Sequence, residues 1–120
     1  MRSILGLALF ALATGCTDSA VPSDTTYRRL VDTYDSESAC LQGGLAGCYQ
    51  LITLCTSGAA SVDVADRPLH GTYTLDGDIA HADLVEMRID FDTSTLSSPQ
   101  LPGRHAWEQR EALVQDCPAE

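Results

Sequence analysis

The sequence predicts a small, mainly β protein, either an antiparallel sandwich or a partial barrel, with one or two short flanking helices and disulfide staples. Three observations lead to this prediction. At least four short segments have the pattern of strands, an Asp-Gly pair lies between two of them, and four cysteines lie beyond the N-terminal segment. A chain of 120 residues allows one domain with only a modest core, which disulfides would supplement.

The N-terminus has the three parts of a secretory signal. Met1 and Arg2 supply a positive end, and residues 4–13 (ILGLALFALA) form an apolar run of ten residues that is too short to cross a bilayer. Small residues then precede Cys16. We therefore predict that residues 1–15 are a signal peptide.

The end of this segment, Leu12-Ala13-Thr14-Gly15-Cys16, resembles the lipobox of bacterial lipoproteins, in which a lipid is attached to the cysteine and cleavage occurs just before it. The resemblance covers the first 16 residues and implies lipid attachment at Cys16 in a bacterial cell envelope. In Gram-negative lipoproteins, Asp after the cysteine favours inner-membrane retention; Thr17 stands there, which implies the outer membrane. The alternative is soluble secretion after cleavage behind Ala13.

The number of cysteines favours the lipidated form. Five are present, and an odd cysteine in an exported protein needs an explanation. With a lipid on Cys16, four remain for two disulfides in an oxidising compartment: Cys40, Cys48, Cys55 and Cys117. Three pairings of these four are possible, and we favour the one that joins Cys55 to Cys117.

The mature chain is strongly acidic. From Cys16 onward it carries 17 acidic residues against six arginines and no lysine, a formal charge of −11 (6 − 17). This charge repels nucleic acid and anionic head groups, so the partner predicted from the N-terminus is the membrane, reached through acyl chains. The missing lysine excludes Schiff-base chemistry and a phosphate-binding P-loop.

The beginning of the mature chain is predicted to be extended and then helical. Residues 16–25 comprise the lipidated cysteine and a polar, flexible tether, and residues 26–120 form a single small β-rich domain. Apolar residues at helical spacing favour a short helix over residues 25–36, with a strand as the alternative. They are Tyr27, Leu30, Val31 and Tyr34.

The strand pattern is clearest in the middle of the chain. Residues 49–55 (YQLITLC) form an apolar run that suits a buried strand, and Val62 and Val64 alternate with polar neighbours. Residues 71–75 and 78–84 form a predicted hairpin with a type I′ turn at Asp76-Gly77. Its apolar face gathers Tyr73, Leu75, Ala80, Ala82 and Leu84.

The last third combines a strand, a loop and an ambiguous segment. Residues 85–92 (VEMRIDFD) alternate strictly, with Val85, Met87, Ile89 and Phe91 on one face. Residues 97–103 are loop material. Residues 104–117 fit an amphipathic helix, and a strand that carries Trp107 is the competing interpretation.

Candidate chemistry is sparse. Asp78, His81 and Asp83 are candidate metal ligands, but hairpin geometry explains the acidic turn without an ion, so we predict no metal and no cofactor. An acidic strand face made of Glu86, Asp90 and Asp92 could serve a hydrolase, although acids on a solvent-facing strand are ordinary. No catalytic residue is assigned, because the chain lacks G-x-S-x-G and Cys-x-x-Cys.

Trp107, beside Arg104 and His105, could anchor a ligand or partner, but a lone tryptophan in a small domain is more often a core residue, and we favour the core position. Together these features predict a lipid-anchored envelope protein that acts as a non-enzymatic binding or structural module. Two alternatives remain open. A carrier resembling a lipocalin would hold a small apolar ligand in a cavity, and a small hydrolase would bring carboxylates, or a carboxylate and a histidine, together in a cleft.

Overall fold

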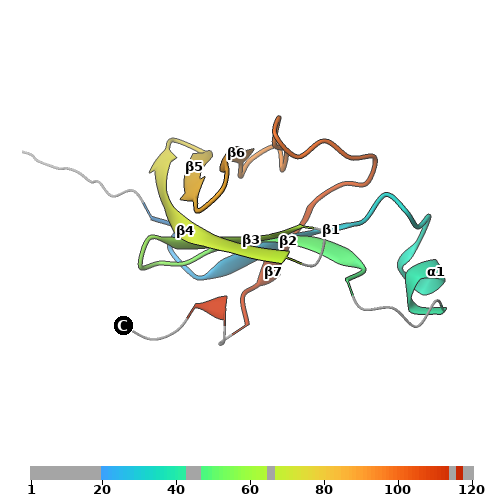
Figure 1. Ribbon diagram of the computed structural model, residues 1–120. Helices are drawn as coiled ribbons and strands as arrows, with labels where there is room; N and C mark the ends of the chain where they lie inside the picture. The colour runs from blue at the N-terminus through green and yellow to red at the C-terminus, as the bar shows by residue number, and fades with distance from the viewer. Residues whose placement is uncertain (1–19, 43–46, 65–66, 114–115, 118–120) are drawn as a thin grey trace, which may run out of the picture.

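The protein is a single curled antiparallel sheet that forms half of a barrel (Figure 1). The computed structural model describes residues 20–42, 47–64, 67–113 and 116–117. The seven strands follow the order β6-β5-β4-β3-β2-β1-β7. Their bounds are β1 Thr25–Leu30, β2 Tyr49–Leu54, β3 Ala59–Val64, β4 Arg67–Asp76, β5 Ile79–Leu84, β6 Arg88–Asp92 and β7 Glu108–Glu111, and one helix, α1, spans Glu37–Gln42. The predicted partial barrel is confirmed.

The curl brings distant strands together around one core. In Figure 1, β5 and β6 lie above the layer that contains β1, β2 and β3. Although four strands separate β6 from β1 in the sheet, the ring centroids of Phe91 and Tyr27 are only 4.7 Å apart. The concave face therefore carries the core, whose largest fully buried side chains are Phe91, Ile52, Leu54, Ile89 and Val62.

Two disulfides staple the sheet. Cys55, just after β2, pairs with Cys117 near the C-terminus, as predicted, and Cys40 of α1 pairs with Cys48. The Cα–Cα distances are 5.7 Å and 5.9 Å, within the ordinary range for disulfides. The first bond ties the end of the chain to the sheet, and the second closes the α1 loop.

The helix predicted over residues 25–36 is wrong for its first half. Residues 25–30 form β1, which pairs with β2 on one side and β7 on the other. Thr25, Tyr27 and Arg29 are all buried, Thr26 is buried as well, and Arg28 and Leu30 are only half-buried. The helical spacing was coincidental, and pairing on both edges decides the conformation because it satisfies the backbone donors and acceptors.

The tether predicted for residues 16–25 ends earlier than expected. Val21 is buried in the core, and its backbone N–H donates to the hydroxyl of Tyr73 at 2.8 Å. That hydroxyl donates in turn to the carbonyl of Cys55 at 2.7 Å. Residues 21–25 therefore belong to the folded domain, and their polar composition did not reveal this.

The predicted hairpin is present, but its pairing is shifted. Leu75 pairs with Ala80 and Asp76 with Ile79, so the two central turn residues are Gly77 and Asp78. Of these two, only Gly77 has a positive φ (+61°), the type II′ pattern rather than the predicted type I′. Each residue pairs with a partner that lies an even number of positions from the predicted one. Side chains alternate between the two faces of a strand, so the residues predicted for the apolar face are still correct.

The strand predicted over residues 85–92 is shorter than expected. β6 begins at Arg88, and the backbone N–H of Leu84 donates to the carbonyl of Met87 at 2.9 Å, which closes a tight turn. Val85 lies in this turn and is 80% exposed, whereas Ile89 and Phe91 are buried. The alternation of apolar and polar residues in the sequence continues through this turn, and only the pairing of the strands shows where the turn lies.

The helix predicted over residues 104–117 is wrong for residues 108–111, where the competing strand interpretation is correct. Residues 108–111 form β7, which extends the sheet beside β1. All four side chains of β7 are exposed and three are charged, a composition that discourages pairing of this edge with another chain. Residues 114–115 lie outside the described residues.

Candidate functional site

The concave face of the sheet holds a buried arginine, Arg29, near one end of β1. Its side chain is at the inward position two residues after Tyr27, and the residue is only 3% exposed. The guanidinium carbon lies 4.4 Å from the ring centroid of Trp107, a cation–π contact. Charged side chains are rarely buried in a protein core, so Arg29 is an unexpected feature of this one.

Neutral oxygen atoms solvate the Arg29 guanidinium. Gln50, the residue of β2 that pairs with Arg29, accepts from Nε at 3.0 Å and also from a terminal nitrogen of the guanidinium. The carbonyl of Leu101 accepts at 2.8 Å and that of Pro102 at 3.4 Å. Within the described part of the chain, no carboxylate lies within 4 Å of Arg29.

Burial lowers the pKa of Arg29 from its ordinary value, because removal from water disfavours the charged form, while the more distant charge of Asp32 opposes this. An arginine remains protonated nonetheless. The positive charge is therefore held in the protein with hydrogen-bond acceptors but without a counter-ion at contact distance.

Trp107 is in the core rather than on the surface. The residue is 5% exposed, and its ring meets that of Phe91 edge to face at 5.6 Å. Its indole Nε1–H is buried and has no hydrogen-bond acceptor among the described residues. A buried donor without an acceptor costs free energy, so this atom is an unused recognition group next to Arg29.

The segment between β6 and β7 crosses the open side of the half-barrel and covers Arg29 (Figure 1). It begins with a turn in which the carboxylate of Asp92 accepts from the backbone of Ser94 and Thr95 at 2.9 Å and 3.1 Å. Leu96 has a positive φ of 56°, and a Cβ on Gly103 would lie 2.7 Å from the guanidinium carbon of Arg29. The tight fit explains why glycine occupies position 103.

A hollow of about 160 Å³ lies between this segment and β1. Arg29 and Trp107 line it together with residues of the crossing segment, which are Leu96, Ser97, Ser98, Leu101, Pro102, Gly103 and His105. The walls of this hollow combine apolar side chains, serine hydroxyls and one cation.

The neighbours of Trp107 in sequence serve to hold the segment in place. Arg104 donates to the carbonyls of Asp32 and Tyr34 at 2.7 Å and 2.9 Å and pairs with the carboxylate of Asp35 at 2.9 Å. His105 donates through Nε2 to the carbonyl of Tyr34 at 2.8 Å. Both side chains therefore hold the crossing segment to the loop that follows β1.

The structure does not gather the candidate metal ligands Asp78, His81 and Asp83. His81 Nδ1 lies 2.6 Å from the carboxylate of Asp90 instead, and Nε2 lies 3.9 Å from that of Asp76. The carbonyl of Asp78 accepts from the backbone of Thr93 at 2.8 Å. A carboxylate and a histidine do meet here, but on the outward face of β5 and β6, where both side chains are about one-third exposed.

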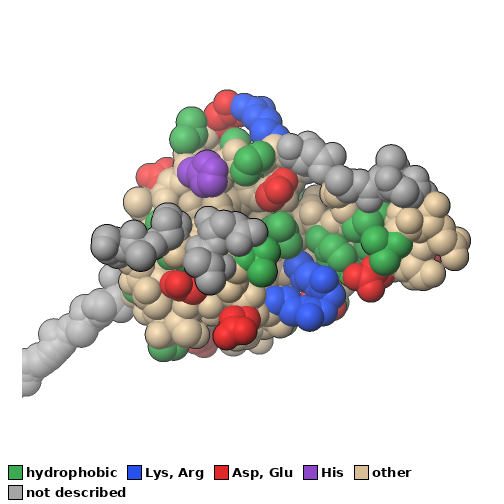
Figure 2. All heavy atoms as spheres, turned by 90° about the horizontal axis from the view of Figure 1, so that it is seen from below, with side chains coloured by type: hydrophobic (Ala, Val, Ile, Leu, Met, Phe, Trp, Pro, Cys, Tyr) green, Lys and Arg blue, Asp and Glu red, His purple; other side chains and the backbone are tan. Residues whose placement is uncertain are grey.

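The acidic strand face is dispersed among structural contacts. Glu86 pairs with Arg67, Asp90 with His81, and Asp92 caps the turn described above. Hydrogen bonds from Ser94 and Thr95 lower the pKa of Asp92. On the face shown in Figure 2, arginine and acidic side chains lie beside one another, and Arg28 and Arg110 both contact Glu108 at 2.8 Å and 2.9 Å.

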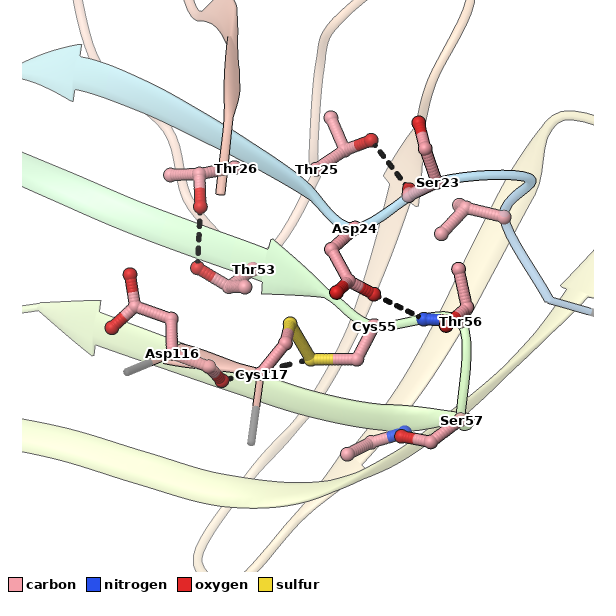
Figure 3. The surroundings of a disulfide bond; sticks show 12 residues. Ser23, Asp24, Thr25, Thr26, Thr53, Cys55, Thr56, Ser57, Asp116 and Cys117 are labelled. Carbon is pink, nitrogen blue, oxygen red and sulfur yellow. Dashed lines mark hydrogen bonds between the residues drawn. A yellow bond between two sulfur atoms is a disulfide. The ribbon is translucent and has the colours of Figure 1, made fainter. Parts of the chain in front are cut away.

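The disulfide at the other end of the sheet has two acidic residues beside it, Asp24 and Asp116. Figure 3 shows Asp24 beside Cys55 and Cys117, with its carboxylate accepting from the backbone N–H of Thr56 at 2.8 Å. Within the described residues these three are the one group of candidate ligand atoms that lies within 4.8 Å. Sulfur atoms in a disulfide are not thiolates, so this group cannot bind a metal as a Cys₂Asp site.

Cys16, the predicted lipid-attachment residue, lies outside the described residues. In the part of the chain that the structure describes, no helix has both the length and the hydropathy needed to span a bilayer. Comparison of the chain with protein-family models, curated proteins and solved structures gives no match.

Sequence reasoning missed Arg29 and Gln50. Arg29 was hidden because residues 25–36 were read as a helix, in which its alternation with Tyr27 has no meaning. The signal that could have found it is the strand alternative, which places both residues on one face. Gln50 follows only from the register between β1 and β2.

Proposed function

We propose that this protein is exported, anchored to the bacterial cell envelope by a lipid on Cys16, and acts there as a non-enzymatic binding module. The observation that carries this proposal is the pairing of cysteines: Cys40 with Cys48 and Cys55 with Cys117 use four of the five in the sequence. Disulfides persist in oxidising compartments, so the pairing agrees with export. The fifth cysteine, Cys16, stands directly after the predicted signal peptide.

The interior of the half-barrel favours a binding module over the lipocalin-like carrier. A carrier of apolar ligands needs a cavity, whereas Tyr27, Phe91 and Trp107 pack against one another inside the curl. The hollow beside Arg29 is too small for a lipid-sized molecule and carries a charge. Binding through this hollow is the activity that we assign to the module.

The contacts of the acidic residues favour a module over the hydrolase. Glu86, Asp90 and Asp92 each have a polar partner within the fold, as described above. General acid–base catalysis requires groups that face a substrate in a cleft.

We extend the proposal to the outer membrane if the host is Gram-negative, because Thr17, not Asp, follows Cys16.

The test is the intact mass of the non-reduced protein from the native membrane fraction. We expect a chain that begins at Cys16, is heavier by its acyl groups and is lighter by four hydrogens because of two disulfides. A Cys16→Ser variant should lose the lipid and leave the membrane fraction. A chain that begins at Thr14, with no lipid and one free thiol, would overturn the proposal.

A further inference from the structure

The charge on Arg29 lacks a counter-ion at contact distance within the described residues, and this is the strongest indication of a ligand in the fold. A charge removed from water is costly unless it is paired, and here only amide and carbonyl oxygens and an indole face surround it. An aromatic side chain at position 29, like that of Tyr27 on the same face of β1, would cost less free energy to remove from water. The cation therefore calls for an explanation beyond packing.

Two N–H donors remain beside the hollow. A guanidinium has five N–H groups, and Gln50, Leu101 and Pro102 accept four hydrogen bonds from it, which leaves one N–H on Nη1. The second donor is the buried, unpartnered Nε1–H of Trp107. The guanidinium carbon lies 4.4 Å from the indole ring centroid, so the two groups are neighbours in the wall of the hollow.

The size and walls of the hollow limit what it can hold. Its volume of about 160 Å³ is close to the cavity size, about 150 Å³, that accommodates benzene in other proteins. Leu96, Leu101 and Pro102 offer apolar contact for a short hydrocarbon tail. One cation in a mature chain with a formal charge of −11 suits a monoanion better than a dianion such as hydrogen phosphate.

We propose that the hollow between β1 and the segment from Leu96 to Trp107 binds a small carboxylate, paired with Arg29 and hydrogen-bonded by the indole of Trp107. This inference rests on the proposed function as a binding module and names its ligand class. The carboxylate replaces the missing counter-ion, and charge-assisted hydrogen bonds of this kind are stronger than neutral ones.

Trp107 is the only tryptophan of the chain and reports on the hollow directly. The lipidated protein in detergent is titrated with sodium acetate and with sodium butyrate while its tryptophan fluorescence is recorded. Sodium chloride at equal ionic strength is the control. We expect a saturable change at millimolar carboxylate that chloride does not produce; the absence of saturation, or an equal response to chloride, would overturn the proposal.

Arg29→Gln tests the counter-ion, and Arg28→Gln is the matched control, since it makes the same change one residue away on the opposite face of β1. We expect Arg29→Gln to weaken acetate binding by about tenfold or more and Arg28→Gln to leave it unchanged. Equal affinities in the two variants would contradict the site.

A second variant covers the case in which Arg29→Gln fails to fold. Ser97 is exposed and lines the hollow, so Ser97→Tyr should block the entrance and abolish the acetate response without removing a buried group. A retained response would place binding elsewhere and overturn the proposal. The intact mass tests the lipid anchor independently, so either idea can fail while the other survives.

Discussion

At the scale of single residues, burial separates side chains that the sequence pattern treats alike. Phe91 and Val85 have the same parity in one predicted strand, yet Phe91 is 1% exposed and Val85 is 80% exposed. Phe91 touches the rings of both Tyr27 and Trp107, and so it joins β6 to β1 and to the crossing segment. This ring therefore packs between strands that are far apart in the sheet order.

Phe91→Ala should therefore destabilise the protein by about 3–5 kcal/mol, because it removes a large buried ring and leaves a cavity. Urea unfolding followed by circular dichroism measures this difference. Val85→Ala is the control and should change the unfolding free energy by less than about 0.5 kcal/mol. Similar losses for the two variants would show that Phe91 is not the closing contact.

Tyr73 has a comparable role at the other end of the core. Its hydroxyl joins the backbone of Val21 to that of Cys55, and burial raises the pKa of its phenol. Tyr73→Phe should cost about 1–3 kcal/mol, because a buried N–H and a carbonyl each lose a partner. Hydrogen exchange of the Val21 amide should speed up in this variant, and unchanged protection would refute the role.

At the scale of elements, the segment between β6 and β7 forms a turn, lines the hollow beside Arg29 and covers the edge of β6. Gln100 accepts from the backbone N–H of Asp90 at 2.8 Å, so its side chain occupies the otherwise open edge of β6. The turn at Asp92 starts this segment and depends on an ionised carboxylate. The conformation of the segment that covers Arg29 therefore depends on the protonation state of Asp92.

This dependence predicts a response to acid. Asp92 has a lower pKa in the folded state, so its contribution is present above the ordinary Asp pKa of about 4 and is lost as the pH falls through the folded value. We expect NMR titration to give a depressed Asp92 pKa. Acid should loosen residues 93–95 first, seen as faster hydrogen exchange.

The control for this response is Asp78→Ala. The contacts between residue 78 and Thr93 run through the backbone carbonyl, so this variant should keep the wild-type acid response. Asp92→Ala should instead show fast exchange of the amides of Ser94 and Thr95 at every pH. An unshifted Asp92 pKa, or equal behaviour of the two variants, would show that the carboxylate does not hold the turn.

At the scale of the whole molecule, the two disulfides act over very different lengths of chain. Cys55 and Cys117 are separated by 62 residues, and Cys40 and Cys48 by 8. A longer closed loop restricts the unfolded chain more, with an expected stabilisation of about 4 kcal/mol for the first bond and about 2.5 kcal/mol for the second.

Removing the pair Cys55 and Cys117 by double substitution with Ala should therefore lower the unfolding free energy by more than removing Cys40 and Cys48. Cys40, Cys48 and Cys55 are buried and Cys117 is half-buried, so each variant removes packed side chains and the main difference between them is loop length. Urea unfolding of both variants measures the difference. An equal or inverted order would show that native contacts outweigh loop closure.

The sequence by itself determined the β class, the faces of the β4–β5 hairpin, and the cysteines that form the disulfides. These features depend on local alternation, turn residues and composition, which neighbouring residues encode. The lipid anchor on Cys16 rests on the N-terminal pattern and stays a prediction.

Only the tertiary structure decided that residues 25–30 are a strand, that Val85 lies in a turn, and that Arg29 is buried over Trp107. The physical reason is that each depends on pairing or packing with residues far along the chain. β1 is a strand because β2 and β7 satisfy its backbone, and Arg29 meets Gln50 only through the register of those strands. Local patterns hold no information about such partners.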